Sequence, residues 1–377
     1  MGTASIDIRP VENRRDLMRF IKMPERVYRG NRCWVPRLLV ERKEFFDRRK
    51  NPFFKHAEVA LFIALEGGIP VGRISAHISF AHNKFHQEKT GFFGFFETVD
   101  DYAVAEKLLQ TAVDFSRDQG MDRLRGPMNF TTNHDVGLLL NAFDRPPVIM
   151  MTYNPEYYVR FVERFGFVKA MDLYAYYTED RNPTPERVIR VIDRVKKRSG
   201  CTFRSIDFGN VKREVAAIKE VYDRAWADNW GFVPLSDEEF DFTAKDLKKI
   251  ADPDLILIAE DGGQPVGFSL ALPDFNQVLI KLNGRLLPFG IFKLLWLTKV
   301  RRVTDGIRVF MMGILPEYQK RGLDNVFYYE TYERGTKRGY RWGEFSWVLE
   351  NNEMMNRVAK NLGHTRYKTY RIYDYDL

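Results

Sequence analysis

A short segment of this chain occurs twice, and the repeat constrains the fold more than any other feature of the sequence. Residues 64–72 recur as residues 259–267, 195 positions later, with six of nine residues identical. Each copy has a Gly-Gly pair between two runs rich in apolar and β-branched residues, which is typical of a β-hairpin with a tight turn. Internal similarity at a fixed offset indicates that one structural unit is used twice.

A second pair of segments matches in the same order. Residues 161–167 align with residues 358–364, 197 positions apart. In both, apolar residues at helical spacing lead to Gly166 or Gly363, where a glycine would end the helix, and a tyrosine-rich run follows. Two matches at nearly the same offset indicate a duplication.

The length of 377 residues also favours two domains. We place the boundary in the polar, proline-marked stretch 179–185, which gives domains of residues 1–180 and 181–377. A helix should then begin near Glu186 and run to about Ser199. The halves differ by insertions around residues 127–150 in the first and 276–305 in the second.

Composition excludes several classes of protein. The net charge of +8 is modest and comes without a long Lys/Arg tract, so nothing indicates specific nucleic-acid binding. Two cysteines cannot form a disulfide scaffold or a Cys-rich zinc site, and they suit a reducing cytoplasm. The histidines His82 and His86 have helical i, i+4 spacing but no completing ligands, so we expect no metal. No apolar run approaches the roughly 20 residues of a transmembrane helix, and we expect a cytoplasmic protein.

The chemistry-bearing motif lies in the second half. Residues 308–315 have the pattern of a strand, a turn containing Gly322 follows, and apolar residues at helical spacing begin at Leu323. A glycine turn that opens a helix presents unpaired backbone N–H groups at the positive end of the helix dipole, which suits a pyrophosphate. Lys320 and Arg321 add positive charge there.

Residues 319–324 resemble the pyrophosphate loop of the GNAT (N-acetyltransferase) superfamily, which has the pattern Gln/Arg-x-x-Gly-x-Gly/Ala. The family's later Asn-x-x-Ala-x-x-Leu-Tyr-x-x-x-Gly-Phe pattern is echoed over residues 352–364. With the hairpin, these features occur in the family's order. The resemblance covers the second half well, and the first half only through its hairpin and its final helix, glycine and strand.

The resemblance implies a mixed α/β (α+β) fold of two GNAT-like domains, each a twisted, mostly antiparallel sheet flanked by helices. It implies acetyl-CoA or another acyl-CoA as co-substrate, lying between two diverging central strands. The residues that would contact the cofactor are Met312, Gly313, Ile314, Gln319, Lys320, Arg321, Gly322, Leu323, Asp324 and Asn352.

Two positions depart from the family pattern. Asp324 stands where the family has Gly or Ala and puts a negative charge near the pyrophosphate, and Ala359 stands where the family often has the tyrosine that protonates the leaving thiolate. Amine acylation still needs a base, for which Glu350 after the next predicted strand is the candidate. Tyr329 and Glu344 are reserves.

The first half has no such loop. Its corresponding segment, residues 96–101, is acidic and lacks glycine, so this half is predicted to be a degenerate copy without coenzyme A binding. The insertion 286–302 is strongly apolar and ends in basic residues. We favour a lid or helix packed on the second domain, and the alternative is an interfacial helix with weak membrane-surface contact.

The sequence therefore predicts an acyl-CoA-dependent N-acyltransferase that acts on a small-molecule amine or peptide. An aminoacyl or long-chain acyl transferase is an alternative, as is a non-catalytic binding protein built on a degenerate transferase pair. The sequence specifies neither the acceptor nor the oligomeric state.

Overall fold

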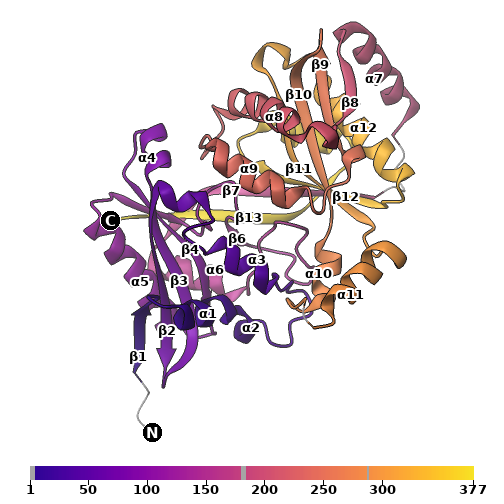
Figure 1. The fold of residues 1–377 in the computed structure, drawn as a ribbon. Helices are drawn as coiled ribbons and strands as arrows, with labels where there is room; N and C mark the ends of the chain where they lie inside the picture. Colours follow the sequence, from indigo (N-terminus) through magenta and orange to yellow (C-terminus); the bar gives the residue numbers. More distant parts are fainter. Residues whose placement is uncertain (1–4, 180–183, 287) are drawn as a thin grey trace. The chain divides into compact units, whose positions relative to one another are not determined.

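The computed structural model describes residues 5–179, 184–286 and 288–377, and Figure 1 shows its elements. The predicted boundary at residue 180 lies largely outside these ranges, so the division at that point stays a prediction. The chain forms two compact units. Unit 1 comprises residues 1–173, 279–291 and 368–377, and unit 2 comprises residues 174–278 and 292–367.

Unit 1 begins with a strand, three short helices and a hairpin. Its elements are β1 (Ile6–Pro10), α1 (Arg14–Lys22), α2 (Pro24–Val27), α3 (Leu39–Phe45), a 3-10 turn (Pro52–Lys55), β2 (Ala57–Glu66), β3 (Ile69–Ser79), α4 (Phe80–His86), β4 (Thr90–Thr98), α5 (Tyr102–Asp118), β5 (Arg123–Gly126), β6 (Leu138–Leu139) and α6 (Tyr157–Phe165). Strands β1 to β4 pair antiparallel in sequence order, and β4 pairs parallel with β5.

Unit 2 repeats this order of elements. It contains α7 (Glu186–Ser199), β8 (Thr202–Ser205), α8 (Val211–Trp226), α9 (Asp237–Leu247), β9 (Ile256–Asp261), β10 (Gln264–Pro273), β11 (Gly306–Ile314), α12 (Leu323–Lys337), β12 (Trp342–Leu349) and α13 (Glu353–Asn361). Strands β8 to β11 pair antiparallel in sequence order, and β11 pairs parallel with β12. The helix predicted over residues 186–199 is confirmed.

The two hairpins at the repeat have the same turn. Gly67 and Gly68 have φ of 56° and 79°, and Gly262 and Gly263 have φ of 56° and 83°. In each hairpin the last paired residues directly flank the two glycines: Glu66 pairs with Ile69, and Asp261 pairs with Gln264. Positive φ at both central residues defines the turn that matches the twist of a hairpin, and glycine adopts it without strain. The duplicated sequence therefore encodes a duplicated structure.

Two long strands pass from one unit to the other. β7 (Val168–Glu179) follows α6, and its residues from Tyr174 onward belong to unit 2, where β7 neighbours β12. β13 (Thr365–Asp376) follows α13, and its residues from Lys368 onward belong to unit 1, where Tyr373–Asp376 pair with β5. Each half of the sequence thus supplies the strand after its last helix to the other unit.

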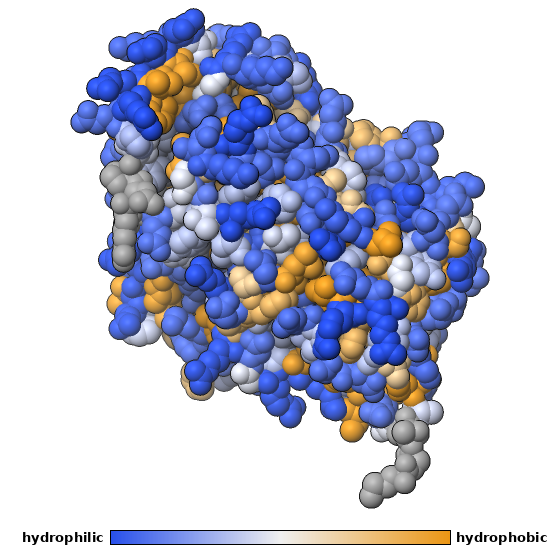
Figure 2. All heavy atoms as spheres, turned by 180° about the vertical axis from the view of Figure 1, so that it is seen from behind, coloured by the Kyte–Doolittle hydropathy of each residue, from blue (hydrophilic) through white to orange (hydrophobic). Residues whose placement is uncertain are grey.

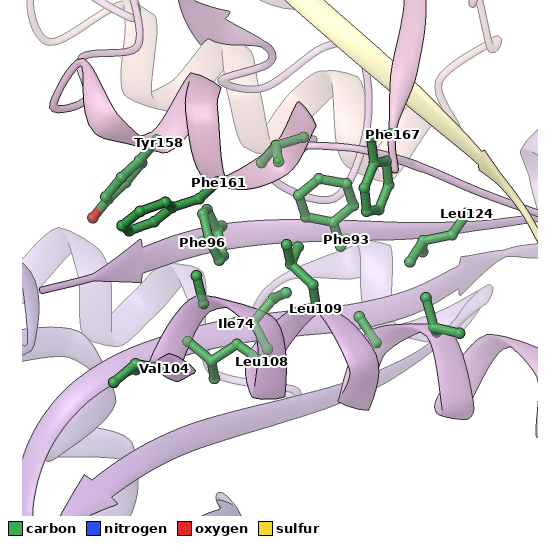
Figure 3. Close-up of a cluster of buried hydrophobic side chains, with 14 of the residues drawn as sticks. Ile74, Phe93, Phe96, Val104, Leu108, Leu109, Leu124, Tyr158, Phe161 and Phe167 are labelled. Atoms are coloured by element: carbon green, nitrogen blue, oxygen red, sulfur yellow. The ribbon is translucent and has the colours of Figure 1, made fainter. Parts of the chain in front are cut away.

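The core of unit 1 lies between its sheet and the helices α5 and α6. Figure 3 shows side chains from β3, β4 and β5 meeting those of the two helices. The buried residues labelled there are Ile74, Phe93, Phe96, Val104, Leu108, Leu109, Leu124, Tyr158, Phe161 and Phe167. The aromatic run 92–96 forms the buried middle of β4.

The insertion of the second half forms α10 (Asn276–Leu282), α11 (Gly290–Leu295) and a π-helical turn (Trp296–Val300) between β10 and β11 (Figure 1). The favoured expectation that its apolar side chains pack is wrong for most of them. Phe289, Phe292 and Val300 are 77%, 68% and 70% exposed, while Leu297 is buried. In the described ranges of the chain, no helix is both long enough and apolar enough to cross a bilayer.

Candidate functional site

The central strands of unit 2 separate part of the way along. Gly306 of β11 pairs with Trp342 of β12, and the pairing continues as far as Val309 and Phe345. Beyond that point the described residues of the two strands do not pair with each other. There β11 pairs only with β10, and β12 has β7 as its neighbour. Phe310 is the extra residue of a bulge in β11 opposite β10, and bulges bend a strand and increase its twist. The bend directs the end of β11 away from β12, and a gap opens between the two strands.

Backbone groups of β11 point into this gap. The Leu315 N–H donates to the Val266 carbonyl oxygen at 2.9 Å, which fixes the residues of β11 that bond to β10. Because bonding direction alternates along an antiparallel strand, Met312 and Ile314 direct their N–H and C=O groups away from β10 and into the gap. The Met312 carbonyl accepts from the Trp226 indole at 2.9 Å and the Ile314 carbonyl from the Gln319 amide at 3.2 Å.

The loop after β11 leads to an open helix end. Lys320 and Gly322 have φ of 61° and 85°, and no side chain caps the N-terminus of α12. The first N–H groups of an α-helix have no partner within the helix and carry its positive dipole end, so they suit an anion. Lys320 and Arg321 are exposed beside them, and the Arg321 guanidinium lies 4.5 Å from the centre of the Tyr318 ring.

Gly322 is also close to α7. A Cβ atom at Gly322 would lie 3.2 Å from a methyl group of Val195, so the helix that opens unit 2 packs directly on this loop. Lys196, one residue later, forms an ion pair with Glu330 of α12. These two contacts fix α7 beside the open end of α12 and keep the loop in place.

Asp324 occupies the first turn of α12, where the resemblance predicts a cofactor contact. Its half-buried carboxylate accepts a hydrogen bond from the Asn325 side-chain amide at 3.3 Å. Burial raises the pKa of this carboxyl, and the nearby backbone N–H groups of Asp324 and Asn325 oppose that rise only in part. A negative side chain therefore lies on the first turn of α12, beside the place where a pyrophosphate would bind, and Leu323 next to it is buried.

Asparagines define the end of β12. The Asn352 side chain accepts from the Met355 N–H at 3.1 Å and so caps α13. The Asn356 amide donates to the carbonyl oxygens of Leu349, Glu350 and Asn352 at 3.0, 3.3 and 2.9 Å. Its own oxygen accepts from the Tyr176 hydroxyl at 2.7 Å. Asn356 thus sets where the diverging strand stops, a role that the sequence pattern did not indicate.

A cavity of ≈ 500 Å³ lies within unit 2, which is a typical size for a ligand pocket. Helices α7, α12 and α13 and strands β11 and β12 all contribute to its wall. Val309 and Phe345, the last pair before the strands separate, form part of the wall, so the cavity begins at the apex of the gap. It extends along α12 from Asn325 to Thr336, about three helical turns.

The catalytic candidates lie in different places. Tyr329 lines the cavity, and its pKa is raised by burial and then by nearby carboxylates. Glu350 follows β12 on the diverging side of the gap and lies outside the described residues that line the cavity. The reserve Glu344 is buried and lines the cavity, and its carboxylate accepts from the Ser346 hydroxyl at 2.5 Å and from the Tyr367 hydroxyl.

A buried arginine that sequence reasoning missed belongs to the same group. Arg308 is fully buried opposite Glu344 in the ladder and donates to the Ser346 hydroxyl and carbonyl at 3.0 and 3.2 Å. The alternation of β12, in which Glu344, Ser346 and Val348 are the buried residues, is the signal that could have revealed it. Charged and polar groups this deep are retained only when they bond to each other.

The corresponding gap in unit 1 is filled by the chain itself. β4 and β5 pair only from Thr90 to Phe92, and the Met128 N–H then donates to the Phe93 carbonyl at 2.7 Å. The Phe95 N–H donates to the Asn129 side chain at 2.7 Å. The Asp101 side chain caps α5, where unit 2 has its open loop. In this copy, residues that follow β5 therefore bond to the part of β4 that faces the gap in unit 2.

In the parts of the chain that the structure describes, no group of three or more His, Cys, Asp or Glu residues is arranged to hold a metal ion. The rings of His82 and His86 lie 4.5 Å apart, and burial lowers the pKa of His82 to about 4. A neutral, buried His82 near Glu88 fits a packing role in unit 1.

A bulged central strand, a gap beside it and a glycine turn opening a helix define a GNAT-fold protein, and solved structures agree. A tandem GNAT protein from the clavulanic acid biosynthesis pathway aligns with a TM-score of 0.57 over 99% of this chain and 98% of its own, at 10% identity. A GCN5-related N-acetyltransferase from Sphaerobacter thermophilus aligns with a TM-score of 0.54 over 98% and 95%, at 13% identity. The chain has the GNAT fold twice.

Sequence relatives define the family more narrowly. The chain is 38% identical to the bacterial ceramide synthase of Caulobacter vibrioides over 98% of its length and 97% of that protein. It is 34% identical to the protein YghO of Escherichia coli over 97% of its length and 94% of that protein. The chain belongs to the family that contains these two proteins. No protein-family model matches it.

Proposed function

We propose that this protein transfers an acyl group from acyl-coenzyme A to the amino group of a long-chain amine and forms an amide. One observation carries the proposal. The gap between β11 and β12 receives the backbone N–H groups of Met312 and Ile314 beside the open N-terminus of α12. This arrangement offers donors to a pantetheine arm and to a pyrophosphate at once.

The long-chain amine is inferred from two facts. The relative from Caulobacter is named a ceramide synthase, and a ceramide is the amide of a fatty acid and a long-chain amino alcohol. The cavity that starts at the apex of the gap has the size and the largely apolar wall that a hydrocarbon chain requires. We therefore place a hydrocarbon chain of one of the substrates along α12.

The reaction needs few groups. The amine nitrogen attacks the thioester carbonyl, the carbon–nitrogen bond forms, the carbon–sulfur bond breaks, and the thiolate leaves. We propose Glu350 as the base that takes the amine proton, directly or through water, because it follows β12 where the strands are apart. Tyr329 keeps its proton at neutral pH, since its pKa is raised, and is the proposed proton donor to the thiolate.

The test is an assay of the purified protein with acyl-coenzymes A of increasing chain length and a long-chain amino alcohol. Mass spectrometry detects the amide and a thiol reagent detects free coenzyme A. The variant K320E/R321E should raise the KM for acyl-coenzyme A at least about tenfold, because it reverses the charge beside the pyrophosphate. K212E/R213E, an equal change on exposed residues at the start of α8, should leave it unaltered. Absence of amide with every donor and amine would refute the proposal.

A lipid-binding protein without catalysis is the second candidate, and Asp324 favours it. Its negative carboxylate lies on the first turn of α12, beside the place where a pyrophosphate would bind. Binding of a long-chain amine without turnover, in the presence of acyl-coenzyme A, would support this function instead.

A further inference from the structure

The insertion between β10 and β11 exposes a continuous set of large apolar side chains. Phe289, Ile291, Phe292, Leu295, Trp296 and Val300, here called the 289–300 face, are between 44% and 77% exposed. On the side of the molecule drawn in Figure 2, hydrophilic residues predominate. Six large apolar residues within one turn-rich helical segment are more than scattered surface exposure explains.

The segment is ordered despite this exposure. The Ile291 N–H donates to the Leu286 carbonyl at 2.8 Å, and the Val303 N–H to the Leu297 carbonyl at 3.1 Å. The Thr298 hydroxyl donates to the Leu294 carbonyl at 2.8 Å, and Leu297 is buried on the opposite side. A helix held in this way presents its apolar side chains as a fixed surface.

The charge of the insertion identifies the partner. The sequence contains no acidic residue between Asp274 and Asp305, while Lys281, Arg285, Lys293, Lys299, Arg301 and Arg302 are basic. Lys293, Lys299, Arg301 and Arg302 are exposed next to the 289–300 face, and the Arg301 guanidinium lies 5.3 Å from the Trp296 ring. Apolar and aromatic side chains beside uncompensated cations suit the interface of a bilayer with anionic head groups.

A second copy of this chain is the less favoured partner. In a symmetric dimer the same patch meets itself, so the four cations of one copy would face those of the other without a carboxylate in the segment to balance them. An anionic lipid bilayer supplies negative charge for these cations and an apolar interior for the exposed side chains of the 289–300 face.

We propose that the 289–300 face and its flanking cations bind the surface of an anionic lipid bilayer. The proposal is independent of acyl transfer, although it would bring the protein to the place where a long-chain amine resides. The helix would lie in the interface with Phe292, Leu295 and Trp296 below the head groups and Lys299 and Arg302 among them.

The experiment is co-sedimentation of the full chain with vesicles of phosphatidylglycerol and phosphatidylethanolamine, and with vesicles of phosphatidylcholine alone. We expect binding to the anionic vesicles that weakens with added salt. The variant F292E/L295E should reduce the bound fraction at least about tenfold, and K299E/R302E should abolish the preference for anionic lipid. I69E/V168E makes the same chemical change at exposed apolar residues of unit 1, 52% and 64% exposed, and should bind like the wild type.

An assay of amide formation with an amine dispersed in detergent distinguishes this proposal from the proposed function. F292E/L295E should still form the amide in that assay, because the detergent replaces the bilayer as the source of the amine. Failure of the wild type to sediment with anionic vesicles would overturn the proposal, as would equal binding by F292E/L295E. Light scattering gives a further check. A dimer in the absence of lipid that F292E/L295E converts to a monomer would assign the face to a second copy instead.

Discussion

Asp324 is the residue at which this chain departs most clearly from an ordinary acyl-coenzyme A site. A carboxylate on the first turn of a helix satisfies the same N–H groups that a phosphate would use, so the two compete. The sequence pattern revealed the substitution but not its surroundings, because only the structure shows the carboxylate half-buried on the first turn of α12 and bonded to the Asn325 amide.

Asp324→Ala should tighten the binding of acyl-coenzyme A on the order of tenfold, since it removes a like charge beside the pyrophosphate. Asp324→Asn, which keeps the shape, should have nearly the same effect. Titration calorimetry on the two variants and the wild type measures the change. Weaker binding in both variants would mean that the carboxylate organises the loop and does not compete.

The affinity of the wild type for acyl-coenzyme A should also depend on pH. Burial raises the pKa of Asp324 above its ordinary value, so the folded protein takes up a proton as the pH falls through the raised pKa. The neutral form no longer repels phosphate. Affinity should therefore rise as the pH is lowered towards this raised pKa. Asp324→Asn serves as the control for titration of the ligand itself, and an identical pH profile in this variant would rule out Asp324 as the cause.

Asn352 has two roles that one pair of variants separates. The structure shows it as the N-cap of α13, and the family resemblance predicts a cofactor contact. Asn352→Ala should cost about 1 kcal/mol of unfolding free energy. Asn352→Asp keeps the capping oxygen but loses the amide donor, so it should retain the stability. If Asp at this position also leaves the KM for acyl-coenzyme A unaltered, the residue is only a cap.

At the scale of elements, the sequence predicted those features that depend on local chemistry. The hairpins follow from glycine pairs that adopt positive φ, and α12 follows from Gly322 and helical spacing. The cavity along α12 could not be predicted, because it depends on how far α7, α12 and α13 stand from the sheet. The exposure of α11 could not be predicted for the same reason, because an apolar helix has the same sequence pattern whether it is buried or exposed.

The cavity predicts a change in chain-length preference. Thr331 lines it and is 3% exposed, and its hydroxyl has no hydrogen-bond partner in the described structure. Thr331→Phe should fill the space along α12 and shift the preferred substrate towards shorter chains, read from the amides by mass spectrometry. Thr331→Val keeps the volume and removes the unpaired hydroxyl, so it should preserve the preference and stabilise the fold by about 1 kcal/mol. An unchanged product distribution in Thr331→Phe would place the hydrocarbon elsewhere.

At the scale of the whole molecule, the duplication is visible in the sequence but the exchange of strands is not. The tyrosine-rich ends of the two halves, residues 174–177 and 370–373, have nearly the same pattern. A strand with that alternation can pair in either sheet, so the pattern carries no information about the unit that receives it. The two compact units therefore cannot be obtained by dividing the chain at a single residue.

The contribution of β13 to unit 1 can be measured. The Arg125 guanidinium donates to both carboxylate oxygens of Asp374 at 2.7 and 2.9 Å, and both side chains are largely buried. Asp374→Ala leaves the guanidinium without this partner and should lower the free energy of unfolding of unit 1 by about 3 kcal/mol. Hydrogen exchange in α5 reports on that unit, while α12 should exchange as in the wild type. Equal protection of α5 in the variant would show that β13 contributes little.

The strand exchange also orders events during protein synthesis. The sheet of unit 1 is made mostly from the first 126 residues, yet its strand beside β5 comes from the last ten residues of the chain. A nascent chain can therefore form the hairpins and α5 early, but β5 keeps an unpaired edge until β13 has been made. Every copy passes through a period in which unit 1 lacks this strand and is prone to aggregate, and a chain without residues 373–376 remains in that state.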